Sequence, residues 1–350
     1  MECREARPLV VAVSGVKNSG KTTLIEHLIP RLSARGLRVA TVKHDGHRFE
    51  PERPGTDSFR HLQAGAFGSA VFDGEKFQAV KYAQVDENAL IDLFPEADLI
   101  LLEGFKASCW PKVEIVRKDN SDAPVCDPST LLAIVTELEL PSSCPLLKPE
   151  DYEGLASLLE RYVKTGRSFS GIILAGGYSS RMGRCKAELP FGGLTMIEHQ
   201  VRKLQLLGIE DILIAGYEPK IRGTRFVPDI YPHRGPLSGI HAGLQDAKKE
   251  RALVVSVDAP LLPMAALSAL MQEHEGGVTA LKHGSQLEPL LAVYDCALAP
   301  ICGEILQGER SSVRQLFDRV GLRELRWQGD GKLLENCNTP EEYAALCARA

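Results

Sequence analysis

The chain has 350 residues, of which 44% are hydrophobic and 25% are charged, as is typical of a soluble globular protein. This length favours two domains over one. The net charge of -5 argues against broad nucleic-acid binding, which usually needs a basic surface. No apolar stretch is long enough to cross a bilayer, and the charged N-terminus is unlike a signal peptide. We therefore expect a cytosolic protein with no membrane association, and the nine cysteines without a C-x-x-C pair fit a reduced compartment.

The first phosphate-binding pattern lies near the N-terminus. Residues 9–13 (LVVAV) form an unbroken apolar run that is typical of a central parallel strand. Residues 15–22 (GVKNSGKT) follow and match G-x-x-x-x-G-K-[ST], and apolar residues then recur with helical spacing. Strand, loop and helix together predict a P-loop, in which Lys21 reaches the outer phosphates and Thr22 binds Mg²⁺. The predicted nucleotide contacts of this loop are Gly15, Asn18, Ser19, Gly20, Lys21, Thr22 and Thr23.

A carboxylate is predicted beside this loop. Residues 98–102 (DLILL) form another buried strand, and Glu103 follows it directly. A carboxylate at the carboxyl end of a strand next to a P-loop can hold Mg²⁺ or one of its waters. The alternative is a solvated side chain at a strand end.

Four short motifs together resemble the MobB family, the GTP-binding adaptors of molybdopterin guanine dinucleotide synthesis. They are residues 15–23, 42–44 (VKH), 53–58 (RPGTDS) and 102–106 (LEGFK), and the match runs from about residue 9 to residue 135. The resemblance implies GTP and Mg²⁺ binding, weak GTP hydrolysis and a supporting role. The partners expected for this half are a second copy in a homodimer, molybdoenzyme apoproteins and other cofactor-synthesis proteins.

A short linker is predicted in the middle of the chain. A helix is expected to begin at Pro149, since proline is tolerated in a first helical turn. Residues 164–169 then include Gly166 and Ser168 and mark the expected boundary. The prediction is a first domain of residues 1–165 and a second of residues 166–350, which lie close together because the linker is short.

The second half opens with the most informative stretch of the chain, residues 171–186 (GIILAGGYSSRMGRCK). Its apolar start predicts a buried strand that breaks at Gly176 and Gly177, where the backbone can approach a ligand closely. Arg181 and Lys186 place two cations just beyond the turn, and this combination suits a nucleoside triphosphate. An ordinary turn with solvated basic residues is the alternative.

Later strand ends carry further candidate contacts. Alternating strands and helices imply a mostly parallel three-layer sheet, in which ligands lie beyond the carboxyl ends of the strands. Asp229 ends one predicted strand, residues 235–239 (GPLSG) open the next helix, and Asp258 follows the apolar run 252–257. An aspartate at this edge can hold Mg²⁺ against triphosphate oxygens, whereas taken alone it would be read as a helix cap.

Residues 174–186 resemble the L-A-G-G-x-x-x-R-M-G-x-x-K signature of nucleotidyltransferases, most closely that of the molybdenum cofactor guanylyltransferases (MobA), and the resemblance covers residues 170–350. It implies a catalytic group of Arg181, Lys186 and Asp258, the last as metal ligand. The nucleotide contacts that it implies are Leu174, Ala175, Gly176, Gly177, Lys186, Asp229 and Asp258. The residues that it assigns to the acceptor or the pocket wall are Gly235, Pro236, Leu237, Gly239, Pro289, Asn336 and Asn338. The family often has an asparagine where this chain has Ala215 and Gly216, so one guanine or ribose contact is missing or replaced.

The sequence thus predicts an α/β protein in which a P-loop NTPase-like domain precedes a Rossmann-like, three-layer nucleotidyltransferase domain. The implied reaction joins GTP and molybdenum cofactor (molybdopterin) to give molybdopterin guanine dinucleotide and pyrophosphate, with Mg²⁺ in both sites. Residues 174–177 are expected to present backbone donors to the phosphates. Two alternatives stay open: a nucleotidyltransferase that uses a sugar phosphate or CTP, and a GTP-regulated carrier that delivers the finished cofactor.

Overall fold

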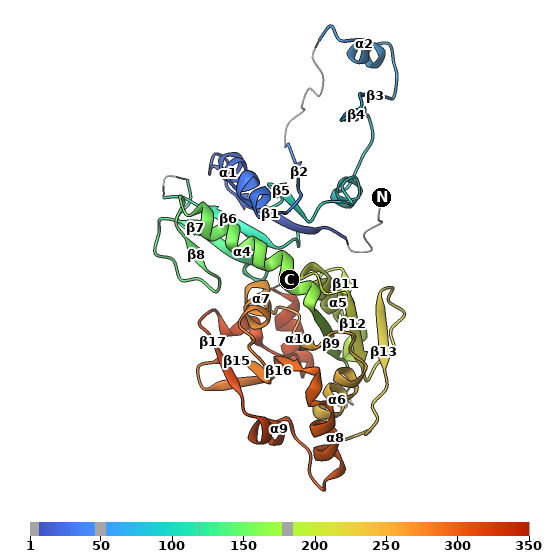
Figure 1. Cartoon of the computed structure of the whole chain (residues 1–350). Coiled ribbons are helices and arrows are strands. Elements are labelled where there is room, and N and C mark those ends of the chain that lie inside the picture. Colours follow the sequence, from blue (N-terminus) through green and yellow to red (C-terminus); the bar gives the residue numbers. More distant parts are fainter. Residues whose placement is uncertain (1–6, 46–53, 119, 177–184, 350) are drawn as a thin grey trace.

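The structure is a computed structural model that describes residues 7–45, 54–118, 120–176 and 185–349. Two α/β units follow one another along the chain, and Figure 1 shows the first above the second. The described helices include none with the length and apolar character needed to span a bilayer.

The first unit is built on a parallel sheet. Its strands are β1 (Leu9–Gly15), β2 (Val39–Lys43), β5 (Leu99–Glu103), β6 (Lys112–Val116), β7 (Leu131–Thr136) and β8 (Leu146–Leu147), with a separate hairpin of β3 (Gly68–Phe72) and β4 (Phe77–Lys81). Its helices are α1 (Lys21–Ala34), α2 (Asp57–Gln63), α3 (Glu87–Ile91) and α4 (Tyr152–Thr165). Within the described ranges this sheet has six strands in the order β2-β5-β1-β6-β7-β8, all paired in parallel.

Strand β1 lies inside this sheet and is buried on both faces. Val11 and Val13 pack in the core formed with α1 and α4, whereas Val10 and Ala12 pack on the opposite side near α3. Burial on both faces explains why the strand reads as a continuous apolar run instead of an alternating one. Its carboxyl end delivers the chain into the predicted P-loop.

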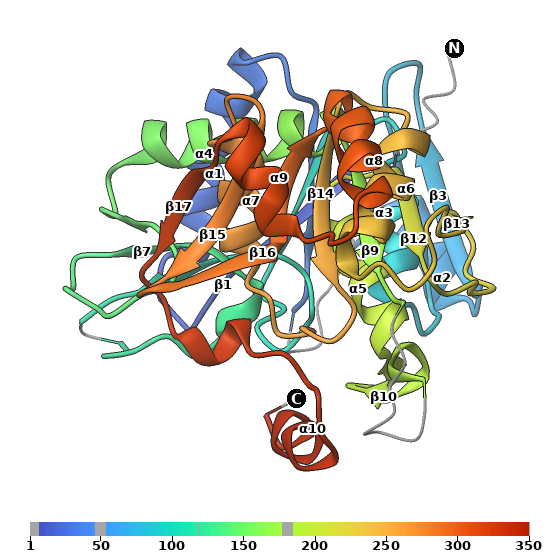
Figure 2. The ribbon, with the colours of Figure 1, turned by 90° about the horizontal axis from the view of Figure 1, so that it is seen from below.

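The second unit has a mixed, mostly parallel sheet. Its strands are β9 (Phe169–Leu174), β12 (Asp211–Ala215), β13 (Thr224–Val227), β14 (Arg251–Ser256), β15 (Val278–His283), β16 (Gln286–Asp295) and β17 (Arg323–Trp327), with a short pair of β10 (Pro190–Phe191) and β11 (Leu194–Thr195). Its helices are α5 (Met196–Leu206), α6 (Pro236–Asp246), α7 (Met264–Gln272), α8 (Ala299–Gln307), α9 (Val313–Val320) and α10 (Pro340–Cys347). The main sheet runs β13-β12-β9-β14-β16-β15-β17, and β16 is antiparallel to both of its neighbours. Helices α6, α8 and α9 cover one face, and α5 and α7 cover the other (Figure 2).

The two units meet where α4 ends. A turn of 3-10 helix, Gly166–Ser168, leads from α4 into β9, and we propose the domain boundary at Thr165. The expected start of this helix at Pro149 is wrong, because Asp151 caps it by accepting a hydrogen bond from the Gly154 N–H, 2.9 Å away. The Tyr162 hydroxyl donates to the carbonyl of Leu206 on α5, which ties the two units together.

A cavity of about 850 Å³ lies between the units, lined by residues of α3 and α5 and by the start of β1. It is reached from the amino end of β1, whereas the P-loop follows the carboxyl end of the same strand. The cavity is therefore separate from the strand-end sites described next.

Candidate functional site

The first candidate site surrounds the turn from β1 into α1. Gly15 has φ +142°, and a Cβ there would lie 2.6 Å from the Ile115 carbonyl oxygen, so the tight turn needs glycine. Helix α1 begins at Lys21, directly after Gly20. The backbone N–H groups of its first turn are thus directed toward the loop, an arrangement suited to binding phosphate.

Lys21, Thr22 and Glu103 meet at this loop. The Lys21 Nζ donates to the Val16 carbonyl oxygen at 2.7 Å, and burial lowers the pKa of its ammonium group. The Thr22 hydroxyl donates to Glu103 Oε1 at 2.7 Å, and Lys43 Nζ lies 3.1 Å from the same oxygen. Parallel pairing of β1 with β5, with Val13 opposite Glu103, brings the carboxylate to the hydroxyl across 81 residues of sequence. A hydroxyl and a carboxylate oxygen at this position form a suitable half-site for Mg²⁺.

The remaining predicted loop residues take different positions. Asn18 has a positive φ of 63°, and its carbonyl accepts a hydrogen bond from Asn120 Nδ2 at 2.9 Å. Ser19 is fully buried, and its Oγ has no partner among the described residues, whereas Thr23 is exposed. The involvement of Asn120 could not be read from the sequence, because no motif marks it.

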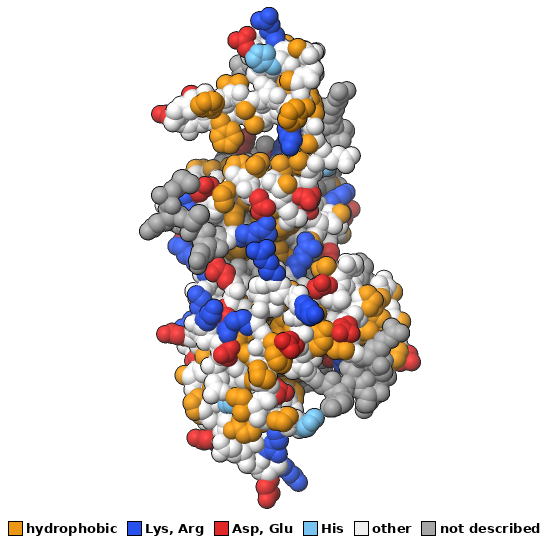
Figure 3. All heavy atoms as spheres, turned by 90° about the vertical axis from the view of Figure 1, so that its right-hand side faces the viewer, with side chains coloured by type: hydrophobic (Ala, Val, Ile, Leu, Met, Phe, Trp, Pro, Cys, Tyr) orange, Lys and Arg blue, Asp and Glu red, His pale blue; other side chains and the backbone are white. Residues whose placement is uncertain are grey.

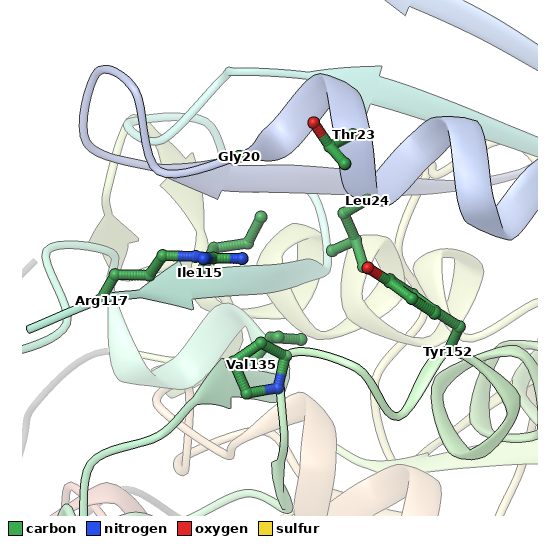
Figure 4. Close-up of a pocket in the computed structure, with 8 residues that line it drawn as sticks. Gly20, Thr23, Leu24, Ile115, Arg117, Val135 and Tyr152 are labelled. Carbon is green, nitrogen blue, oxygen red and sulfur yellow. The ribbon is translucent and has the colours of Figure 1, made fainter.

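Beneath the loop lies a small cavity of about 10 Å³, which has room for one water (Figure 4). The guanidinium of Arg117 faces Gly20 there: a Cβ on that glycine would be 3.6 Å from Arg117 Nη2. No sequence motif marks this arginine. A cavity of this size cannot hold a nucleotide, so a bound triphosphate would lie on the solvent side of the loop.

The second candidate site lies where β9, β12 and β14 end side by side. The Val257 N–H donates to the Leu174 carbonyl at 3.0 Å, and the Ala175 N–H donates to the Ala215 carbonyl at 2.9 Å. The prediction that Ala175 offers its N–H to phosphate is therefore wrong for this structure, because the sheet already uses that donor. Of the described residues 174–176, Gly176 is the exposed one. Gly177 and Arg181 lie outside the described residues.

Lys186, Asp258 and Asn338 converge at this edge. The Lys186 Nζ lies 2.9 Å from Asp258 Oδ2 and 2.8 Å from Asn338 Oδ1. The Lys186 and Asp258 side chains are only 18% and 15% exposed, so the ion pair is largely shielded from water. The Ser256 hydroxyl donates to the other carboxylate oxygen of Asp258. Sequence reasoning named all three converging residues, but the contact between Lys186 and Asn338 spans 152 residues and comes from the fold alone.

Gly216, one of the two residues that stand where the family often has an asparagine, has no room for a side chain. Gly216 has φ +81°, and a Cβ on it would lie 2.4 Å from the Cα of Gly176. Two backbone segments therefore touch here, and no side chain fits at position 216. The next residue, Tyr217, donates its hydroxyl to Glu188 Oε1 at 2.8 Å, which ties the end of β12 to the loop that carries Lys186.

Asp229 provides a buried acceptor beside the site. Its Oδ1 is buried with no hydrogen-bond partner among the described residues, and burial raises the pKa of the carboxyl group. A Cβ on Gly239 would lie 3.7 Å from that oxygen, which places the start of α6 against it. A buried oxygen without a partner is expected to accept a hydrogen bond from a ligand N–H or O–H.

The remaining wall residues differ in how they can contribute. Gly235 has φ 77° at the N-cap of α6 and Pro236 is its first residue, whereas Leu237 is fully buried and supports the wall from the core. Antiparallel pairing of β16 with β14 directs Pro289 to the edge at which Asp258 lies. Asn336 is exposed next to the buried Cys337, whose N–H donates to the Asp258 carbonyl at 2.8 Å.

Both sites have the donor set that Mg²⁺ uses with nucleotides. No group of three or more His, Cys, Asp or Glu side chains able to hold a metal occurs among the described residues. Mg²⁺ in phosphate-transfer sites is usually bound by one or two protein carboxylates together with waters and substrate phosphates. One carboxylate in each site, with a hydroxyl beside it, fits that mode better than a metal cage built from protein groups alone.

The fold and these strand-end sites define the class: two consecutive nucleotide-binding α/β domains. Residues 10–137 match the family described as molybdopterin guanine dinucleotide synthesis protein B, and residues 171–320 match the MobA-like NTP transferase domain. The chain belongs to the molybdenum cofactor guanylyltransferase family through its second half and to the molybdopterin-guanine dinucleotide biosynthesis adapter family through its first.

Individual relatives match one half each. A probable molybdenum cofactor guanylyltransferase of Carboxydothermus hydrogenoformans is 32% identical over 182 residues, which cover 50% of this chain and 92% of that protein. The molybdenum cofactor guanylyltransferase of Xanthomonas euvesicatoria is 30% identical over 184 residues, 51% of this chain and 95% of its own. A probable molybdopterin-guanine dinucleotide biosynthesis adapter protein of Bacillus subtilis is 35% identical over 130 residues, 36% of this chain and 75% of its own. One polypeptide thus combines a domain of the adapter family with a domain of the guanylyltransferase family.

Proposed function

We propose that this chain transfers GMP from GTP to molybdenum cofactor, giving molybdopterin guanine dinucleotide and pyrophosphate, while its first domain acts as a GTP-binding adaptor. The observation that carries the proposal is the convergence of Lys186, Asp258 and Asn338 at the carboxyl edge of the second sheet, in a chain of this family. The cation is suited to bind phosphate and the carboxylate is suited to bind the metal, next to the exposed Gly176.

The chemistry needs positioning and charge neutralisation more than a base. The terminal phosphate of the pterin substrate is ionised at neutral pH and attacks the α-phosphorus of GTP in line. Lys186 would stabilise the negative charge that develops on the leaving pyrophosphate. Asp258, oriented by the Ser256 hydroxyl, would hold Mg²⁺, which when bound neutralises triphosphate oxygens. The role predicted for Arg181 stays part of this proposal.

Selection of the base is assigned to Asp229. Its buried oxygen without a described partner would accept a hydrogen bond from guanine or ribose. Where the family often has an asparagine, this chain has Ala215 and Gly216, and neither residue offers a polar side chain for that purpose. Asp229→Asn is then expected to raise the KM for GTP more than it lowers kcat.

The first domain would bind GTP with Lys21 on the outer phosphates and with Thr22 and Glu103 on Mg²⁺. Slow GTP hydrolysis there is part of the proposal. Lys21→Ala separates the two roles: a pure carrier would lose cofactor delivery, while guanylyl transfer by the second domain would continue. Lys164→Ala, an exposed α4 change whose partner Glu160 is on the same helix, is the control.

The deciding assay mixes the purified full-length chain, Mg²⁺, molybdenum cofactor and one nucleoside triphosphate at a time. Release of pyrophosphate together with the guanine dinucleotide, with GTP only, is the expected result. Equal pyrophosphate release with CTP, or with a sugar phosphate as acceptor, would instead support another nucleotidyltransferase.

We also propose that the first domain forms a homodimer through its protruding hairpin. Among the described residues, the strands β3 and β4 pair only with each other, and Figure 1 shows them with α2 extending away from the sheet. Hydrophobic side chains gather on this lobe, at the top of Figure 3. The exposed ones are Phe67, Val71, Phe72, Phe77 and Tyr82. An isolated two-stranded hairpin is marginally stable in water, so an apolar partner surface would both cover and support it.

A double change of the opposed pair Phe72 and Phe77 to Asp and Lys tests this proposal. Sedimentation of the parent as a dimer and of the variant as a monomer, both folded by circular dichroism, is the expected outcome. A parent that sediments as a monomer would point instead to a different protein, such as a molybdoenzyme apoprotein or another cofactor-synthesis protein, as the partner of this surface. We also propose that the protein is cytosolic, which cell fractionation tests.

A further inference from the structure

Two buried polar side chains of α5 face the segment that carries Asp258. Gln200 is 0% exposed and Lys203 is 6% exposed. They lie three residues apart, on one face of the helix. Neither belongs to any motif described above, and neither was expected to take part in the site.

Both side chains donate to main-chain carbonyls. Gln200 Nε2 donates to the Ser256 and Ala259 carbonyl oxygens at 2.9 and 2.7 Å. Lys203 Nζ donates to the Pro260 and Leu262 carbonyl oxygens at 2.7 and 2.6 Å. The four carbonyls flank Asp258 on both sides, and α5 thus holds the chain just before and just after the carboxylate.

This segment has left the sheet and needs such partners. Strand β14 ends at Ser256, and buried carbonyls beyond a strand end must find hydrogen bonds elsewhere. The Asp258 carbonyl is held separately by the Cys337 N–H. With its main chain fixed in this way, the direction of the Asp258 carboxylate depends on few remaining torsions.

Gln200 and Lys203 satisfy these carbonyls, but each side chain is itself in an unfavourable environment. Gln200 Oε1 is buried with no hydrogen-bond partner among the described residues, which is unfavourable for a polar atom. Lys203 has no ion pair with a carboxylate among the described residues, and burial lowers its pKa to about 7 even though Asp127 of the first domain opposes the shift. Apolar side chains would avoid these two penalties but would leave the Ser256, Ala259, Pro260 and Leu262 carbonyls without their donors. Local violations of this kind are expected where a site requires them.

We propose that Gln200 and Lys203 are positioning residues for the metal-binding carboxylate. By fixing residues 256–262 from behind, they keep Asp258 between Lys186 and the Ser256 hydroxyl, with its carboxylate directed to the nucleotide edge. The inference rests on the proposed function, because it takes Asp258 as the Mg²⁺ ligand. Residues that orient a metal ligand typically change metal affinity by about 10–100-fold.

The test measures Mn²⁺ binding, without turnover, by electron paramagnetic resonance. The full-length chain carries Lys21→Ala to weaken the first site, and a GTP analogue with an uncleavable α–β bond is present. Gln200→Met and Lys203→Met are expected to raise the Kd for Mn²⁺ about 10-fold or more. In the turnover assay the same changes should lower kcat more than they alter the KM for GTP.

Two variants of the same helix serve as controls. Gln205→Met replaces an exposed glutamine of α5, and Val201→Ala lowers stability at a buried apolar position that does not contact the segment by hydrogen bonds. If Mn²⁺ affinity follows thermal stability, with Val201→Ala as weak as the Met variants at equal loss of Tm, the positioning role is overturned. Gln200→Glu, which keeps the size but replaces the two N–H donors by a carboxyl group with at most one donor, carries the test if a Met variant does not fold. Asp258→Asn tests the proposed function separately. Unchanged Mn²⁺ binding in that variant would reject Asp258 as the metal ligand.

Discussion

Replacement of Lys186 by alanine tests the proposed chemistry most directly. The change removes the one cation that the structure places against Asp258 and Asn338, at 2.9 and 2.8 Å, among the described residues. It also leaves a carboxylate that is only 15% exposed without its partner. Turnover and stability are therefore both expected to respond, and they must be measured separately.

The magnitude follows from the charge that develops on the leaving group. At about 4 Å and an effective dielectric constant of about 20, one unit of charge on each side interacts by about 4 kcal/mol. If roughly half to all of a unit develops near Lys186, about 2–4 kcal/mol is lost from the transition state. At about 1.4 kcal/mol per tenfold change, kcat should fall by roughly 30- to 700-fold, which is of the order of 10²-fold.

The assay is pyrophosphate release from GTP with molybdenum cofactor at saturating concentrations, alongside thermal unfolding of each variant. Lys164→Ala removes an exposed lysine of the first domain and should leave kcat as in the parent. Lys186→Arg keeps the charge but changes the donor geometry and should fall between the two. A folded Lys186→Ala variant with kcat within about twofold of the parent would refute this use of the charge.

Three further predictions concern stability and metal binding. Gly216→Ala should lower the free energy of unfolding, measured in urea, by about 2 kcal/mol or more, because its Cβ would lie 2.4 Å from the Gly176 Cα. Gly284 has φ +57° in open space, so Gly284→Ala should lower the free energy of unfolding less. Burial lowers the pKa of His199 to about 3, below the ordinary value of 6.5, so the unfolded chain takes up the proton first as the pH falls. The contribution of neutral His199 to the free energy of unfolding is therefore complete above pH 6.5 and should shrink by about 2 kcal/mol between pH 6.5 and 5. An unfolding free energy with the same pH dependence in His199→Phe would contradict this. Glu103→Gln should weaken Mg²⁺-dependent GTP binding to the first domain, measured by calorimetry, and binding equal to that of the parent would remove the carboxylate from that site.

The local elements followed from the sequence because their signals are local. The apolar run of β1, the glycines after it and the helical spacing of α1 specify strand, tight turn and helix within about 25 residues. The start of α10 is equally local, because Thr339 and Glu342, three residues apart in the sequence, form its capping box. One local boundary was wrong, since the Asp151 side chain competes successfully with Pro149 for the start of α4.

The family resemblance extended this reading from elements to chemistry. It named Lys186, Asp258 and Asn338 without indicating which of them touch, and the structure brings all three together. It also implied backbone donors along residues 174–177, but the Ala175 N–H is used by β12. A motif specifies which groups are present, whereas the sheet decides which of their hydrogen bonds are already made.

The sequence by itself determined the two α/β units, their order and the residue types at each strand end. Only the tertiary structure decided that Thr22 meets Glu103, that Gly216 packs against Gly176, and that Gln200 and Lys203 hold the segment around Asp258. The physical reason is that these contacts join residues far apart in the chain. They depend on strand order, on register and on which helix covers which face, none of which a local pattern of residues encodes.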